Sequence, residues 1–446
     1  MDANQIRAHA AQRESSRVRY MILFLLFIIT TITYADRATL SVTAPQMKDE
    51  LGITSLQMGY IFSAFSWSYV IAQLPSGWIL DKFGSKRVYF WAIALWSFFT
   101  LMQGTVGWIS STIMAAAALF VLRLLMGFAE APAFPTNAKV VSAWFPVSER
   151  GTASAVFNSG QYFAAVAFTP LMAWLTHYFG WHVVYVVMGV VGFILAIIWL
   201  KSMRDPVRHP SISQAELDLI EQGGGTIDST KMNAQARTQK FNWGQVRQLL
   251  GSRMMIGVYI AQFFINVLTY FFITWFPIYL VEQRGMNILE AGMLASLPAI
   301  CGFSGGILGG VFSDALLRRG FSLTAARKTP IVLGMLLASS IILCNYTSEV
   351  WVVIALMSVA FFGKGLGALG WAVVADTSPK EAIGLSGSLF NTFGNIAGIV
   401  TPIVIGYIIS ITHSYNGALI FVGVSSLATM LCYLLVVKDI KRMEFH

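Results

Sequence analysis

The stretch GWILDKFGSKR at residues 77–87 determines how the chain is organised, because a matching stretch, GVFSDALLRRG, recurs at residues 310–320. Each copy has a glycine, an aspartate four residues later and then a basic cluster. A glycine lets helices approach closely, and an aspartate can pair with a cation or cap the next helix. Two copies at equivalent places indicate an internal repeat rather than ordinary loop charge. The residues expected to form latches on the inner side are Gly77, Asp81, Lys86, Arg87, Gly310, Asp314 and Arg318.

Long hydrophobic segments surround both copies. Of the 446 residues, 56% are hydrophobic and 11% are charged, whereas a soluble domain has roughly 25% charged residues. A helix that crosses a bilayer needs about 20 apolar residues. We therefore predict an all-α membrane protein whose partner is the lipid bilayer, with twelve spans at 18–40, 55–80, 88–108, 111–142, 151–176, 181–200, 253–281, 289–313, 329–346, 350–376, 384–411 and 415–437.

The net charge of +9 reflects topology and does not indicate nucleic-acid binding. The first span has no small-residue cleavage site, so we interpret it as a retained helix. The predicted outer loops carry only Lys48 and Arg284 as cations. Such an asymmetry places both termini in the cytoplasm. The predicted inner segments carry Arg7, Arg13, Arg17, Arg19, Lys82, Lys86, Arg87, Arg150, Arg204, Arg208, Arg318, Arg319, Arg327, Lys328, Lys441 and Arg442, among others.

A polar segment at residues 201–252 divides the chain into a first half, residues 1–200, and a second half, residues 253–446. Within this linker, ISQAELDLIEQGGG predicts a short helix. Ser213 is expected to cap its start, with Glu216 completing a capping box, and Gly223 to end it. Six predicted spans on either side of a cytoplasmic linker are typical of transporters built from repeats. Their substrate site lies at mid-membrane between the halves.

The chain resembles the major facilitator superfamily, whose signature is the repeated loop motif, over residues 18–440. Within that superfamily it is similar to the anion:cation symporters, and most of all to the bacterial glucarate/galactarate proton symporters. The resemblance implies alternating access in the bacterial inner membrane, with protons driving uptake of a sugar-derived dicarboxylate. It rests on YADRATL (34–40), MGYIFSAFSWSYV (58–70), GFAEAPAFPTN (127–137), AWFPVSERGTA (143–153), TWFPIYL (274–280), FFGKGLGALGW (361–371) and LFNTFGNIAGIVTP (389–402).

Four charged residues lie inside predicted spans of the first half: Asp36, Arg37, Arg123 and Glu130. A charge at the bilayer centre costs roughly 2.5–3.5 kcal/mol even on permissive scales, so it is usually partnered and functional. Arg123 and Glu130 are seven residues apart and share a helix face, about 10 Å apart along the axis. We expect the first span to pack on the fourth so that each acid finds an arginine. A purely structural salt bridge remains the alternative, although buried pairs are poor stabilisers.

The chemistry of these four side chains separates their expected roles. Arginine keeps its proton and can bind a carboxylate through two hydrogen bonds, so Arg37 is the candidate for a substrate carboxylate. Burial raises a carboxylate pKa and a nearby arginine lowers it, so the acids can exchange protons. Glu130 is the first candidate proton carrier and Asp36 the second. The resemblance implies the same division, with Arg123 holding an acid in its charged form.

Lys364 gives the second half a charge of its own, in the predicted tenth span. No acid lies within two helical turns of it, which invites a second carboxylate from outside the chain. The alternative is an internal partner such as Asp376. That residue is twelve positions away, about 18 Å along a straight helix, so direct pairing would need a break in the helix.

Uncharged polar residues in the spans complete the candidate substrate site. The resemblance places them around a sugar-acid cavity, with Trp371 packing on the carbon chain. Each of these polar side chains could equally well form a hydrogen bond between helices instead of binding substrate. They are Tyr34, Tyr69, Gln161, Gln262 and Asn391, while Asn395, one turn from Asn391, is a weaker candidate.

Other classes of function have little support in the sequence. The three cysteines lie in apolar segments, without a disulfide framework or metal spacing. The letters of a dinucleotide fingerprint at residues 365–370 fall inside a span with no preceding strand. We expect a monomeric carrier of an organic anion and protons, without enzymatic activity, cofactor, metal or nucleic-acid partner. The alternatives are a symporter for a monoacid such as a hexuronate or aldonate, or a membrane sensor.

Overall fold

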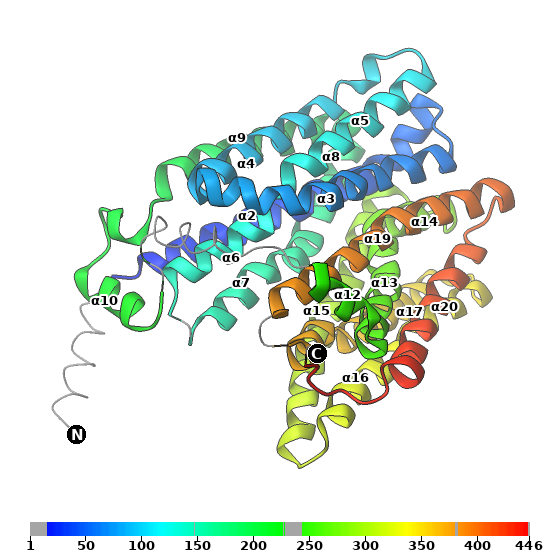
Figure 1. Cartoon of the computed structure of the whole chain (residues 1–446). Helices are drawn as coiled ribbons and strands as arrows, with labels where there is room; N and C mark the ends of the chain where they lie inside the picture. The colour runs from blue at the N-terminus through cyan, green and yellow to red at the C-terminus, as the bar shows by residue number, and fades with distance from the viewer. Residues whose placement is uncertain (1–15, 147, 226, 228–242, 380–381, 445–446) are drawn as a thin grey trace.

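The computed structural model describes residues 16–146, 148–225, 227, 243–379 and 382–444, and all regular structure in them is helical (Figure 1). The first half contains α2 (Val18–Leu51), α3 (Ser55–Phe83), α4 (Ser85–Gln103), η1 (Val106–Trp108), α5 (Thr112–Glu130), α6 (Ala133–Trp144), α7 (Arg150–Phe163), η2 (Ala164–Phe168), α8 (Thr169–Phe179) and α9 (Trp181–Ser202). The linker contains η3 (Pro206–Arg208), α10 (Gln214–Gln222) and α12 (Trp243–Gly251). The second half contains α13 (Arg253–Thr274), α14 (Phe276–Glu282), α15 (Ile288–Arg318), α16 (Leu323–Ala338), η4 (Ser339–Tyr346), α17 (Val350–Leu366), α18 (Gly370–Thr377), α19 (Ile383–Thr412), α20 (Asn416–Leu431) and η6 (Cys432–Val437).

Every predicted span overlaps a helix or a run of consecutive helices. In the described part of the chain, ten helices are long and apolar enough to cross a membrane. The count of twelve and the cytoplasmic placement of the termini stay predictions. The fourth predicted span is divided into α5 and α6 just before and after Pro132, where a proline removes a backbone donor.

The first helix is longer than predicted. We expected it to end near residue 40, but α2 continues to Leu51 and stops at Gly52, whose φ of 67° is the left-handed conformation that ends many helices. The adjacent charges Asp36 and Arg37 do not end it, because both side chains are taken up inside the protein. Thr54 and Gln57 then form a capping box that starts α3.

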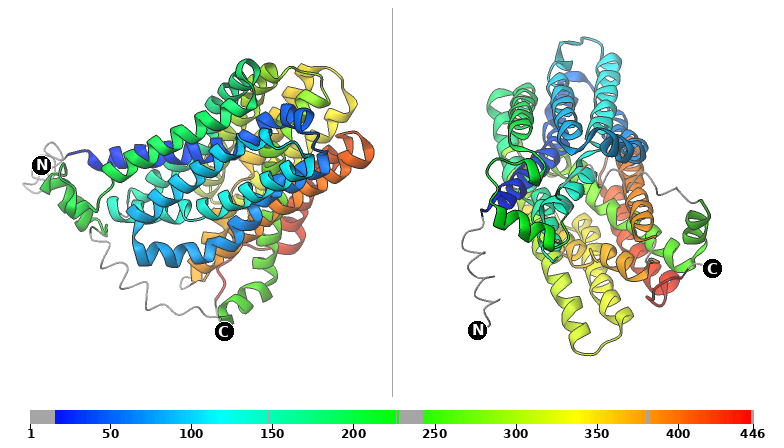
Figure 2. Two further views of the ribbon diagram at one scale, coloured as in Figure 1. Left: turned by 90° about the horizontal axis from the view of Figure 1, so that it is seen from above. Right: turned by 60° about the vertical axis from the view of Figure 1, so that its left-hand side comes forward.

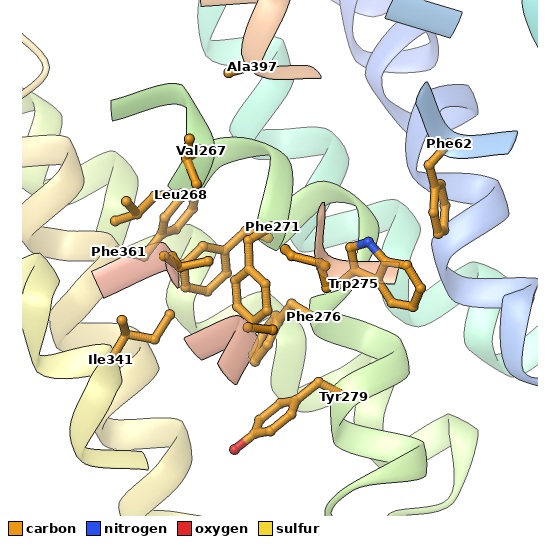
Figure 3. Packing of buried hydrophobic residues seen from close by; sticks show 14 of the residues in the cluster. Phe62, Val267, Leu268, Phe271, Trp275, Phe276, Tyr279, Ile341, Phe361 and Ala397 are labelled. Carbon is orange, nitrogen blue, oxygen red and sulfur yellow. The ribbon is translucent and has the colours of Figure 1, made fainter. Parts of the chain in front are cut away.

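The two halves meet at one end of the molecule and diverge towards the end that carries both termini (Figures 1 and 2). At the closed end, Phe62 of α3 lies edge-on to Trp275 between α13 and α14, with ring centres 5.6 Å apart (Figure 3). Gly59 of α3 also lies directly against the backbone of Pro402 in α19, where a Cβ would clash. The positive-inside pattern predicts that this closed end is the outer one.

The repeated motifs lie at the open end, and their glycines are not helix contacts in this conformation. A Cβ added at Gly77 or Gly310 would have no neighbouring atom within 4 Å, because the halves stand apart at this end. The role of these loops as latches stays a prediction. In the second copy Asp314 pairs with Arg327 at 3.6 Å. The side chain of Asp81, in the first copy, is outside the described part of the structure.

The linker helix α10 is attached to the first half. Ser213 caps it as predicted, accepting a hydrogen bond from the Glu216 amide at 3.2 Å. The predicted capping box is wrong, because the Glu216 carboxylate is fully buried and holds the start of α2 instead. It accepts from the Ser16 hydroxyl at 2.5 Å and the Val18 amide at 3.1 Å, and pairs with Arg19 at 3.4 Å.

Candidate substrate and proton site

Arg37 of α2 and Glu130 at the end of α5 form an ion pair inside the first half. Arg37 Nε donates to Glu130 Oε1 at 2.6 Å, and Arg37 Nη2 contacts the same oxygen. The Glu130 side chain is fully buried, while the Arg37 side chain is 11% exposed. The arginine that we selected for the substrate is therefore engaged with the acid that we selected for the proton.

Three aromatic rings surround the guanidinium of Arg37. Its central carbon lies 4.8 Å from the ring centre of Tyr34, 4.7 Å from that of Phe65 and 5.0 Å from that of Tyr69. Cations are attracted to the faces of such rings, and more strongly when water is excluded. The rings therefore fix the position of Arg37 while leaving one edge accessible. Sequence reasoning included both tyrosines but missed Phe65, which nothing distinguishes from other span residues.

Asp36 does not find an arginine, contrary to the expectation that each acid would. Asp36 is 2% exposed, and neither of its carboxylate oxygens has a hydrogen-bond partner in the described part of the chain. Arg123 instead lies with Nη1 3.7 Å from Met126 Sδ and its guanidinium over Phe65. Because neighbouring side chains on a helix diverge by about 100°, Asp36 points into the half while Arg37 points to the interface.

A cavity of about 90 Å³ lies between the halves; Tyr34, whose ring contacts Arg37, lines it, whereas Arg37, Tyr69 and Glu130 do not. One water needs roughly 10–15 Å³, so the cavity has room for a small organic molecule. The residues that we predicted for the substrate and that line it are Tyr34, Gln161 and Lys364. Ser41, Tyr162 and Thr269 also line it and were missed, because hydroxyl side chains are common throughout membrane helices.

Lys364 of α17 has no acidic partner among the described residues. Its Nζ lies 5.3 Å from the ring centre of Phe361. Asp376, the internal partner considered above, is taken by Arg327, whose Nε donates to Asp376 Oδ2 at 2.8 Å. The ammonium of Lys364 therefore faces the cavity without an internal counter-ion in the described chain.

Polar side chains of the second half form a strip on α13 and α19. Tyr270 donates to Asn395 at 3.0 Å, and Asn395 donates to the Asn391 carbonyl at 2.9 Å. Gln262 lies beside Gly370 and Gly394, and Trp371 packs edge-on against Phe390 with ring centres 5.0 Å apart. Neither Gln262, Trp371 nor Asn391 lines the cavity. Asn266 and Tyr270 were missed, although they follow Gln262 at successive intervals of four residues on one helix face, which could have indicated them.

The fold and the site define a membrane transporter, and the comparison of sequences agrees. A profile of the Major Facilitator Superfamily matches residues 26–326, and the chain belongs to this family. It is a multi-pass protein of the bacterial inner membrane and is not an enzyme. Among the described residues, no cluster of three His, Cys, Asp or Glu side chains could hold a metal ion.

Particular relatives place the chain within the family. It is 60% identical to the "Probable galactarate/D-glucarate transporter GudP" of Bacillus subtilis (strain 168), over 96% of this chain and 94% of the relative. It is 40% identical to the "D-galactonate transporter" of Escherichia coli O6:H1, over 96% and 97% of the two chains. A solved bacterial homologue of the human lysosomal transporter Spinster shares the fold, with a TM-score of 0.71 at 17% identity, over 95% and 96% of the two chains. The resemblance to galactarate/glucarate transporters of the major facilitator superfamily is thereby confirmed.

Proposed function

We propose that this protein takes up a sugar-derived dicarboxylate, galactarate or D-glucarate, together with protons by alternating access. The relative reported above at 60% identity bears a name for transport of these acids. The proposal keeps residues 1–200 and 253–446 as the two moving halves, joined by residues 201–252. It also keeps a monomer with both termini in the cytoplasm.

The observation that carries the proposal is the presence of two cations on opposite sides of the interface. Arg37 belongs to the first half, and Lys364 lines the cavity from the second half without an acidic partner in the described chain. A molecule with a carboxylate at each end satisfies both cations at once. A monoacid would leave one of them buried without a counter-ion, which is unfavourable. This difference favours the dicarboxylate over a hexuronate or an aldonate.

Proton coupling follows from competition for Arg37. A substrate carboxylate that binds the guanidinium through two hydrogen bonds replaces the Glu130 carboxylate there. Glu130 would then be a buried anion without a cation, a state that is much less favourable than the neutral acid. It therefore takes one proton as the substrate binds. Release of the substrate to the inner side restores the ion pair and frees the proton.

The Glu130→Gln variant tests this coupling, because glutamine keeps the size of the side chain but carries no exchangeable acidic proton. In liposomes, the variant should exchange labelled for unlabelled galactarate but fail to accumulate it when an inward proton gradient is imposed. Glu221→Gln, on the exposed side of α10, serves as the control and should accumulate normally. Intact gradient-driven accumulation by Glu130→Gln would show that Glu130 is not the coupling acid.

A further inference from the structure

Seven deeply buried polar residues of the first half, Glu130 among them, form a group of which no member lines the cavity. All are at most 3% exposed. Some of their side-chain atoms have no hydrogen-bond partner among the described residues, whereas about 90% or more of buried polar groups normally have one. These atoms are Asp36 Oδ1 and Oδ2, the Tyr89 hydroxyl, Trp96 Nε1, Gln103 Oε1, Arg123 Nε, Glu130 Oε2 and Asn137 Oδ1.

Donors and acceptors in this group face one another in pairs without bonding directly. The indole of Trp96 faces the carboxylate of Asp36, and the Tyr89 hydroxyl faces the amide of Asn137. Trp96 Nε1, both Asp36 oxygens, the Tyr89 hydroxyl and Asn137 Oδ1 have no direct hydrogen-bond partner in the described chain. A water molecule can bridge two polar groups that do not bond directly. Buried waters commonly make about three such bonds to groups that the protein leaves unsatisfied.

The group occupies two levels along the helices. Asn137 donates to the Thr30 hydroxyl at 3.1 Å. Thr30 precedes Asp36 by six residues on α2, about 9 Å along the axis, and Tyr89 precedes Trp96 by seven residues on α4, about 10 Å. Both helices run from the predicted inner end to the outer end. The inner level is therefore Thr30, Tyr89 and Asn137, and the central level is Asp36 and Trp96.

Glu130, at the end of α5, belongs to the same buried group of the first half. One of its carboxylate oxygens holds Arg37, and the other, Oε2, belongs to the unsatisfied group. Asp36, like Glu130, has no surface on the cavity. Asp36 is 2% exposed, so a proton that reaches its carboxylate must pass between side chains that pack around it.

We propose that Tyr89, Trp96 and Asn137 hold bound water molecules that connect Asp36 with Glu130, so that protons pass between the two carboxyl groups inside the first half and not through the substrate cavity. In each transfer a protonated carboxyl gives its proton to the first water. Each water passes one proton on, and the last gives one to the other carboxylate, so that charge and atoms balance. The three side chains are positioning residues for this water chain. The inference rests on the proposed proton coupling.

The Tyr89→Phe variant tests the water chain, since it removes a hydroxyl and keeps the ring that packs on Trp199 with ring centres 4.9 Å apart. We expect gradient-driven accumulation of galactarate to fall by about tenfold, because the variant loses roughly one hydrogen bond to the water chain that carries the proton. Exchange of labelled for unlabelled galactarate should change less than twofold. The matched control is Tyr259→Phe in the second half, whose equally buried hydroxyl bonds directly to Ser386 at 2.8 Å. It should retain both activities.

If Tyr89→Phe does not fold, Trp96→Phe removes the indole N–H and makes the same prediction. Infrared difference spectra recorded on a pH jump give a second measurement: wild type should show an O–H stretching band that shifts in water labelled with oxygen-18, and the variant should lose it. Unchanged accumulation in the variants, or no labelled-water band in wild type, would overturn the water chain. Loss of proton dependence in wild type itself would instead overturn the proposed function.

Discussion

Lys48 of α2 and Glu282 of α14 join the two halves at their closed end, with Lys48 Nζ 2.6 Å from Glu282 Oε1. Lys48 also donates to the Ser55 hydroxyl at 3.0 Å, and the Tyr415 hydroxyl donates to Glu282 at 2.8 Å. This end cannot open unless the lysine and the glutamate separate. The pair therefore stabilises the conformation in which the predicted outer side is closed.

Replacing Glu282 by glutamine should shift the protein towards the conformation with an open outer end. A partly exposed ion pair contributes about 1 kcal/mol at most, which corresponds to a roughly fivefold change in the equilibrium between conformations. Spin labels at Phe83 and Arg319, both exposed on the open end, would report this as a larger fraction of short distances in pulsed electron spin resonance.

Glu290→Gln is the matched control for this shift. Glu290 lies near the same end, but it caps its own helix α15 and glutamine can keep that role. The distance distribution should stay as in wild type. Equal shifts in both variants would show that the Lys48–Glu282 pair has no particular effect on opening.

Replacing Lys364 by alanine should weaken the binding of a dicarboxylate much more than the binding of a monocarboxylate. A hydrogen bond to a charged group contributes about 1.5–3 kcal/mol, so the half-saturation concentration for galactarate should rise by roughly tenfold to a hundredfold. Uptake of galactonate, where measurable, should change by less than threefold. Lys364→Arg keeps the charge and should retain most of the galactarate affinity. Equal losses for the two substrates would contradict a role for Lys364 at the second carboxylate.

Removing the carboxylate of Glu216 should destabilise the start of α2. The buried carboxylate binds Ser16, Val18 and Arg19. Its loss leaves these donors without a partner, which should lower the free energy of unfolding by about 2–3 kcal/mol. Glu216→Ala should therefore show faster amide hydrogen exchange at residues 18–22 and a lower melting temperature. Glu221→Ala, exposed on the same helix, should show neither change.

Alanine at Gly305 and at Gly310 should have opposite effects on stability. A Cβ at Gly305 would collide with the Phe362 carbonyl of α17, whereas one at Gly310 meets nothing within 4 Å. Overpacking of this kind typically destabilises by about 1–3 kcal/mol. Thermal unfolding of the purified protein should show a lower melting temperature for Gly305→Ala and an unchanged or higher one for Gly310→Ala. A stable Gly305→Ala would mean that α15 and α17 can move apart easily.

Much of the fold could be predicted because the membrane restricts the possible structures. Every backbone donor and acceptor must bond within its own segment, so a long apolar run predicts a helix. The exact ends of helices were less predictable. The first helix continues past Asp36 and Arg37 because their partners come from other helices, and the fourth span is divided at Pro132.

The candidate site was predictable as a set of residues and not as a set of contacts. Charged residues are rare inside membrane spans, and this rarity identifies the candidates without any knowledge of which helices pack together. They are Asp36, Arg37, Arg123, Glu130 and Lys364. Hydroxyl and aromatic residues such as Tyr162 and Phe65 carry no such signal, because these types occur throughout membrane helices. Their place in the site became visible only with the cavity and the aromatic rings around Arg37.

The sequence by itself determined that the chain is a membrane protein built from a repeat, and which buried charges need an explanation. The tertiary structure alone decided that Arg37 pairs with Glu130, 93 residues away, that the buried Asp36 carboxylate has no hydrogen-bond partner in the described chain, and that Asp376 pairs with Arg327. The physical reason is that periodicity along a helix is local, whereas the partner of a buried charge depends on how separate helices pack.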